Sequence, residues 1–243
     1  MSDYSVLLEI NTGSGKSTKL AGGVILSSEY VLTAAHNLVD SSNKPISASS
    51  VMIGYGSGQR SEQTNTTGAG ISIHPNFVTS KNTLDYTNDI ALIKVPVLSL
   101  YASTSMAKIY NGNLNPGQSI LTVGWGNTES NAALQGWLRG AVTTIGDDDE
   151  CAKYIDGYTS SNGAQICSYD VSNPKDGANV GDAGSAIIVS QNGQALLAGI
   201  VSQVVYYANP NGSILGIAHV DINVNNHISF ITSVTGLSSD TFY

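Results

Sequence analysis

Three short segments carry residue types that could act together in catalysis. His36 ends the run YVLTAAH, Asp89 directly precedes the apolar run IALIKV, and residues 181–185 form the glycine-rich turn GDAGS before another apolar run. Histidine and aspartate are the residue types of general acid–base catalysis, and glycine lets a backbone approach a ligand closely. Each segment alone is weak, because a histidine after a strand or an aspartate before one more often has a structural role. Together they indicate one chemistry at a backbone-lined site.

Short β-strands must position these residues. Apolar or alternating runs recur along the chain with turn residues between them, which is typical of an all-β sandwich or barrel. The turn-rich stretch at residues 110–118 predicts a boundary between an N-terminal domain, residues 1–110, and a C-terminal domain, residues 111–243. An acidic run at 147–154 predicts a short helix, and the apolar spacing at 224–234 predicts a C-terminal amphipathic helix. The strand-like runs lie at residues 4–10, 23–26, 71–73, 90–95, 120–123, 186–190, 196–202 and 214–220.

The composition excludes several classes of protein. Of 243 residues, 26 are glycine and only 12% are charged, whereas about 7% glycine and about 25% charged residues are usual. Turn-forming polar residues replace the Glu, Lys and Arg of helical bundles, and no apolar run approaches the roughly 18–20 residues of a membrane span. A hydrophobic content of 41% supports a packed core. The net charge of −8, without any Lys/Arg run, disfavours nucleic acid as a partner.

Neither a metal site nor a phosphate-binding loop is visible in the sequence, and we expect no cofactor. Cys151 and Cys167 are either both free or joined in one disulfide, and they form no CxxC pair. His74 and His219 are isolated, so a structural role is expected for each. The run GSGKST lacks the first glycine of a phosphate-binding loop, since Ile10 stands there, and we expect a hairpin turn instead.

Four more motifs extend the pattern along the chain. They are AGGVIL at residues 21–26, IHPNF at 73–77, VGWGNT at 123–128 and GIVS at 199–202. In this order, with the histidine, the aspartate and the glycine-rich turn, they resemble the trypsin/chymotrypsin family of serine peptidases. The resemblance implies two six-stranded antiparallel β-barrels with a short intermediate helix, a C-terminal helix and a site in the cleft between the barrels. It also implies a Cys151–Cys167 disulfide beside the intermediate helix, hence a secreted, extracellular protein.

The resemblance further implies a mechanism. His36 would act as general base and then general acid, while Asp89 would hold its tautomer and stabilise the imidazolium. The backbone N–H groups of Gly181 and of residue 183 would form the oxyanion hole. The family's nucleophile is a serine at position 183, where this chain has Ala183. Without that oxygen no acyl-enzyme forms, and Ser185 is displaced too far to replace it, so we expect an inactive chain.

Two explanations of Ala183 are open. The first is an engineered Ser→Ala variant of an active endopeptidase, which is favoured because His36, Asp89 and the glycine-rich turn are all retained. The alternative is a natural pseudoprotease that acts as a protein-binding module. In both cases we expect a monomer that takes a protein or peptide substrate or inhibitor in the inter-barrel cleft, with no nucleic acid and no membrane as partner.

Other departures from the family pattern concern the N-terminus and the cysteines. No IVGG-like start precedes Tyr4, so we expect that the leader and the mature N-terminus are absent from this sequence. Asp182 then lacks its usual activation-related partner, an α-amino group, and we expect another cation beside it or a rearranged loop at residues 180–183. Ala21 and Asn37 occupy positions that usually carry a disulfide. Their exchange bears on stability more than on chemistry.

The resemblance places the primary specificity pocket before the glycine-rich turn and on two strands. If the segment KDG contains an inserted residue, Asp176 is the base of the pocket and Arg or Lys is preferred; otherwise Gly177 is the base. A surface turn is an equally good interpretation of Asp176, and Val204 would narrow the pocket toward small residues. We favour Arg or Lys. The full expected set of substrate-binding residues is Asp176, Gly177, Ser202, Gln203, Val204 and Gly216.

Overall fold

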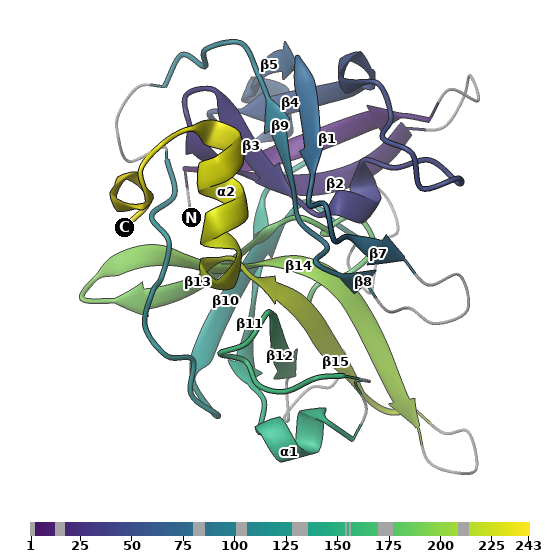
Figure 1. Ribbon diagram of the computed structural model, residues 1–243, viewed down its shortest axis with the longest axis vertical. Helices are drawn as coiled ribbons and strands as arrows, with labels where there is room; N and C mark the ends of the chain where they lie inside the picture. The colour runs from purple at the N-terminus through teal and green to yellow at the C-terminus, as the bar shows by residue number, and fades with distance from the viewer. Residues whose placement is uncertain are drawn as a thin grey trace.

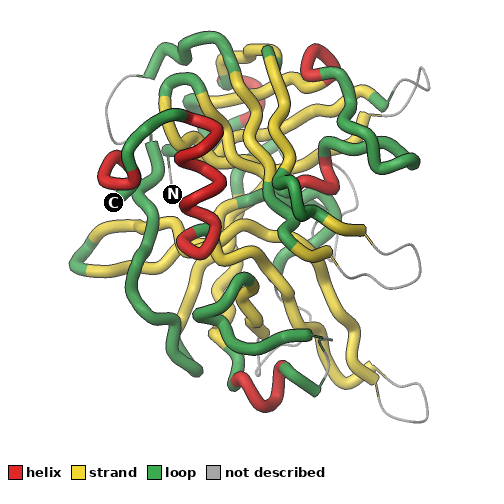
Figure 2. The backbone as a smooth tube through the Cα atoms, viewed as in Figure 1, coloured by secondary structure: helices red, strands yellow, loops and turns green. Residues whose placement is uncertain are grey.

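Strands dominate the molecule. The computed structural model describes residues 3–12, 18–79, 86–100, 106–127, 136–153, 155, 157–169, 177–208 and 214–243. They form two large antiparallel sheets with few helices, as Figures 1 and 2 show. Among these residues we find no helix with the length and apolar character needed to span a membrane. The all-β fold class predicted from the sequence is confirmed.

The N-terminal half forms a curved seven-stranded sheet in the order β5-β4-β1-β2-β3-β9-β6. The sequence predicted a closed, six-stranded barrel here, whereas the sheet has seven strands and is a half-barrel. The difference arises because residues 68 and 69 form a corner that divides one strand into β5 and β6. The Gly68 N–H donates to Val51 O on one side, and the Ala69 N–H donates to Lys94 O on the other. One bent strand thus becomes two edge strands that the chain itself joins. The strands are β1 (Ser5–Asn11), β2 (Thr18–Ser27), β3 (Tyr30–Thr33), β4 (Val51–Tyr55), β5 (Thr64–Thr67), β6 (Gly70–Ile73) and β9 (Ala91–Lys94), with a separate pair β7 (Val78–Thr79) and β8 (Tyr86–Thr87).

The C-terminal half closes into a six-stranded barrel in the order β10-β11-β12-β15-β14-β13. Its β14–β15 ladder is interrupted by a bulge between Ile200 and Gln203. A bulge re-aims the side chains beside it, and here it lies beside Ser202, whose hydroxyl contacts Asp89 of the N-terminal half. The strands are β10 (Ser119–Gly124), β11 (Arg139–Ile145), β12 (Gln165–Tyr169), β13 (Ala186–Gln191), β14 (Gln194–Ala208) and β15 (Ile214–Asn223).

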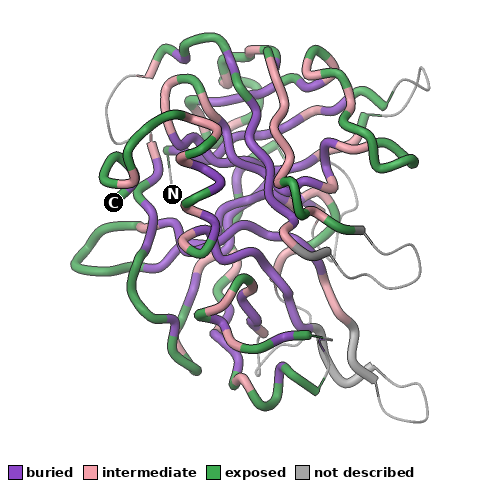
Figure 3. Tube along the Cα trace, in the orientation of Figure 1, coloured by how far each residue is buried: buried purple, intermediate pink, exposed green. Residues whose placement is uncertain are grey.

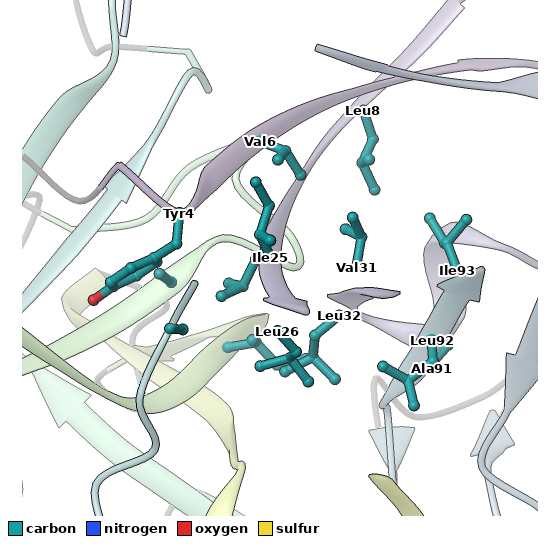
Figure 4. Close-up of a cluster of buried hydrophobic side chains, with 14 of the residues drawn as sticks. Tyr4, Val6, Leu8, Ile25, Leu26, Val31, Leu32, Ala91, Leu92 and Ile93 are labelled. Atoms are coloured by element: carbon teal, nitrogen blue, oxygen red, sulfur yellow. The ribbon is translucent and has the colours of Figure 1, made fainter. Parts of the chain in front are cut away.

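Aliphatic side chains bind the two halves into one core. Figure 3 shows buried backbone running through the strands at the centre, with exposed segments mainly in the connections. Figure 4 shows Val6, Ile25 and Val31, from three neighbouring strands of the first sheet, within one cluster of buried side chains. The same cluster includes Ala186 and Ile200 from the second barrel, so burial of this surface holds the halves together.

Short helices complete the fold. The acidic run gives α1 (Asp148–Cys151), which begins where the Asp147 side chain accepts hydrogen bonds from two backbone N–H groups of its first turn. Helix α2 (Ile228–Thr235) overlaps the expected C-terminal segment at 224–234, begins later and ends one residue beyond it, and buries two apolar side chains, Phe230 and Ile231. The Cys151–Cys167 disulfide is present, as predicted. Single 3-10 turns are η1 (Ala35–Asn37), η2 (Ala48–Ser50), η3 (Arg60–Glu62), η5 (Asn225–His227) and η6 (Ser239–Thr241).

Candidate active site

Neighbouring strand ends bring His36 and Asp89 together. Thr33, the last residue of β3, pairs with Ala91, the first residue of β9, so the turn η1 and the start of β9 lie side by side. The His36 imidazole Nδ1 lies 2.6 Å from Asp89 Oδ2, and the His36 backbone N–H donates to Asp89 Oδ1 over 2.8 Å. Asp89 therefore holds both the ring and the backbone of the histidine.

A third group completes this arrangement from the other half of the protein. The Ser202 hydroxyl on β14 donates to Asp89 Oδ2 over 2.6 Å, and Asp89 is wholly buried. Burial alone raises the pKa of Asp89, but the charge of His36 and the hydrogen bonds from His36 and Ser202 together hold it below its ordinary value. The carboxylate thus stays ionised, which lets it orient an imidazole.

The position expected for the nucleophile is fixed against the N-terminal sheet. The Ala183 carbonyl oxygen accepts from the Gly22 N–H and from Asn37 Nδ2, both over 2.9 Å. Gly184 follows with φ +86°, and any Cβ there would overlap the Thr33 hydroxyl and the Gly22 carbonyl oxygen, so only glycine fits. Ala183 and His36 line the same cleft.

The turn before Ala183 presents backbone donors to that cleft. Gly181 has φ +100° and lines the cleft. No acceptor in the described ranges takes a hydrogen bond from the N–H of Gly181 or of Ala183. These two donors are the ones that the family resemblance assigns to an oxyanion hole, where such groups stabilise developing negative charge.

Backbone N–H groups hold the Asp182 carboxylate. Its carboxylate accepts from the Gly126 N–H over 2.8 Å and from the Asn179 N–H over 3.0 Å. No cation among the residues with described coordinates forms an ion pair with it. Burial raises its pKa, and the two backbone bonds oppose that rise. The described partners of Asp182 are thus backbone N–H groups, and the expected cation and the rearranged loop at residues 180–183 both stay predictions.

Ser185 is not placed to act in the cleft. Its side chain is 2% exposed and packs against Gly22 and Gly124, where a Cβ on either glycine would collide with the hydroxyl. The sequence-based rejection of Ser185 as a substitute nucleophile agrees with this burial.

The cleft that contains these groups has a volume of about 510 Å³. Of the expected substrate-binding residues, Ser202, Gln203 and Val204 line it. Gly177 lies against the imidazole of His219, and Gly216 pairs with Tyr207 in the β14–β15 ladder. Asp176 lies outside the described residues. The cleft is also lined by Thr18, Lys19, Leu20, Asn127 and Asn179.

Sequence reasoning missed three contributions. It assigned Ser202 to substrate binding, whereas its hydroxyl also supports Asp89. It did not single out Lys19, whose ammonium donates to His36 O over 3.3 Å. It also missed Asp221, a wholly buried carboxylate that accepts the Ser202 N–H over 3.1 Å. Of these three, only Asp221 had a recognisable signal in the sequence, because it is a lone acidic residue within an apolar run.

Comparison with known proteins agrees with this geometry. The Trypsin family model matches residues 2–228. Granzyme H from Homo sapiens is 26% identical over 210 residues, which cover 83% of this chain and 75% of the granzyme. Granzyme-like protein 1 from Rattus norvegicus is 26% identical over 221 residues, 86% of this chain and 78% of its own. Serine protease 1 from Drosophila melanogaster is 29% identical over 146 residues, 58% of this chain, and the match spans about half (51%) of that relative. The chain belongs to the trypsin family of serine proteases.

Proposed function

We propose that this chain is the scaffold of a secreted, trypsin-like serine endopeptidase, inactive in this form because Ala183 stands where the nucleophile belongs. The observation that carries the proposal is the assembled group of His36, Asp89 and Ser202, which comes from both halves of the molecule. His36 and Ser202 line the cleft with Ala183, and Asp89 is buried behind them. We take Ala183 as an engineered Ser→Ala change, because His36, Asp89 and the glycines of the turn at residues 181–184 are all retained.

The mechanism follows from these positions once a serine stands at 183. His36 takes the hydroxyl proton as the serine oxygen attacks the peptide carbonyl carbon. The N–H groups of Gly181 and residue 183 hold the resulting oxyanion. His36 then gives the proton to the leaving amine, and water repeats the sequence on the acyl-enzyme. A methyl group has no oxygen to attack with, so none of these steps begins in the present chain.

The disulfide supports the proposed location. Cys151 and Cys167 are bonded, and such bonds persist in oxidising compartments. The cleft between the halves is the proposed binding place for a protein or peptide substrate or inhibitor.

Restoring the nucleophile tests this function. We expect Ala183→Ser to hydrolyse casein at least about 10⁴-fold faster than the parent, a typical scale for removing a nucleophile. The matched control is Ala183→Ser with His36→Ala, which has the hydroxyl without its base and should stay near the parent. Both variants should keep the parent's thermal unfolding profile.

A folded Ala183→Ser protein that does not hydrolyse casein contradicts the proposed endopeptidase function. That result favours the alternative, a natural pseudoprotease that binds a partner in the cleft, and pull-down of an uncleaved partner that blocks the cleft then identifies it.

A further inference from the structure

A lysine lies inside the cleft, next to the histidine. Lys19 stands at the start of β2, lines the cleft and donates from Nζ to the backbone oxygen of His36 over 3.3 Å. An ammonium group has three donors. The hydrogen bond to His36 uses one of them, and in the described part of the chain no carboxylate lies within ion-pair distance of Lys19.

This ammonium is partly buried at the edge of the cleft. Burial lowers the pKa of Lys19, and the charge of Asp89 acts in the opposite direction. Asp89 itself is already engaged by His36 and Ser202. Apart from His36, Lys19 is the one ionisable side chain among the described residues that line the cleft. A ligand carboxylate would therefore meet a cation that is partly desolvated and has donors to offer.

The position of Lys19 fixes which half of a peptide it would meet. The cleft has the β2 end, with Thr18, Lys19 and Leu20, and the β14 end, with Gln203 and Val204. The histidine delivers a proton to the leaving amine, so the leaving half of a peptide lies beside His36. The Lys19 ammonium donates a hydrogen bond to the backbone oxygen of that same residue.

We propose that Lys19 is a specificity-determining residue that selects an acidic side chain in the first two positions after the scissile bond. This inference rests on the proposed function, because it assumes that a peptide crosses the cleft past His36.

The experiment uses a mixture of synthetic peptides with random residues on both sides of the cleaved bond, digested by the Ala183→Ser protein and sequenced by mass spectrometry. We expect Asp and Glu to exceed Asn and Gln about tenfold at one of these two positions, the scale of a charge-assisted hydrogen bond. Adding Lys19→Gln should abolish the preference, and Lys19→Arg should retain it. The exposed Lys94 on β9 supplies the matched control, since Lys94→Gln removes the same charge from a residue that does not line the cleft. The preference should weaken in 0.5 M NaCl because salt screens charges.

The absence of acid enrichment, or an enrichment that survives Lys19→Gln, overturns the proposal while cleavage itself still supports the endopeptidase. If Ala183→Ser cleaves nothing, the same peptides are passed over immobilised, unaltered protein. Retention of acidic peptides that Lys19→Gln abolishes supports the role of Lys19 without hydrolysis. Retention without acid preference, or no retention, overturns it.

Discussion

Replacing Ser202 by alanine measures how far the active-site carboxylate depends on the C-terminal barrel. The Ser202 hydroxyl donates to Asp89 Oδ2 over 2.6 Å, and the two residues are 6% and 0% exposed. Alanine is slightly smaller than serine, so Ser202→Ala creates almost no cavity and mainly removes the donor. A hydrogen bond to a buried charged group contributes about 1.5–3 kcal/mol. We therefore expect Ser202→Ala to lower the free energy of unfolding by about 2 kcal/mol at pH 7.

The pH dependence of that loss separates the charged bond from ordinary packing. The folded pKa of Asp89 lies below its ordinary value, so the unfolded chain binds its proton first as the pH falls. The stability from the ionised group is then complete above about pH 4 and is lost as the pH falls through the lower, folded pKa. The difference between Ser202→Ala and the parent should be constant from pH 7 to about pH 4 and should shrink below it toward about 1 kcal/mol, the value for a neutral hydrogen bond.

Urea denaturation of both proteins between pH 3 and pH 7 measures these differences, with Ser190→Ala as the control. Ser190 is exposed on β13, so its replacement should change stability by less than about 0.5 kcal/mol. A loss below about 0.5 kcal/mol for Ser202→Ala at pH 7, or a loss that grows on acidification, refutes the reasoning.

Three further predictions concern buried groups near the cleft and the disulfide. Burial raises the pKa of Asp221 to about 8, so the folded state holds its proton more tightly and the free energy of unfolding falls as the pH rises from about 4 to 8. In urea titrations, the stability advantage of Asp221→Asn over the parent should therefore grow along this range. A constant difference between the two proteins contradicts this. Gln203 Oε1 is buried without a partner among the described residues. Gln203→Leu should therefore raise the free energy of unfolding by about 1 kcal/mol, and it should weaken peptide binding measured by fluorescence anisotropy. Destabilisation would show that the oxygen has a partner. The disulfide joins cysteines separated by 16 residues, so the double Cys151→Ser, Cys167→Ser variant should lose about 3 kcal/mol in chemical denaturation, and an unchanged midpoint rules out that contribution.

The sequence predicted those features that depend on local pattern and motif order. Strand-like alternation and turn residues indicated the all-β fold, and the acidic run placed a helix where α1 begins. Motif order identified His36 and Asp89 as a pair, and the structure joins them at 2.6 Å. The disulfide followed from the family resemblance and is present. These features could be predicted because each depends on a few neighbouring residues or on a single pairing.

Contacts between residues far apart in the chain could not be predicted from the sequence. Asn37, noted only for a missing cysteine, binds the Ala183 carbonyl oxygen across 146 residues. Asp182 accepts hydrogen bonds from two backbone N–H groups, and no local pattern shows which backbone N–H groups would serve. Ser202 reaches Asp89 from beside a β14 bulge whose register no local pattern reveals. The corner at residues 68 and 69 likewise changed the strand count without changing the strands' hydrophobic pattern.

Covalent labelling of residue 183 tests the central claim most directly. The Ala183→Ser protein is incubated with a biotinylated fluorophosphonate, which reacts with a serine that has an active base, and the labelled peptide is mapped by mass spectrometry. We predict one adduct, on residue 183, that appears in Ala183→Ser and is missing from both the parent and the Ala183→Ser, His36→Ala double variant. An Ala183→Ser protein that is folded yet takes no label, or that is labelled equally without His36, contradicts the account.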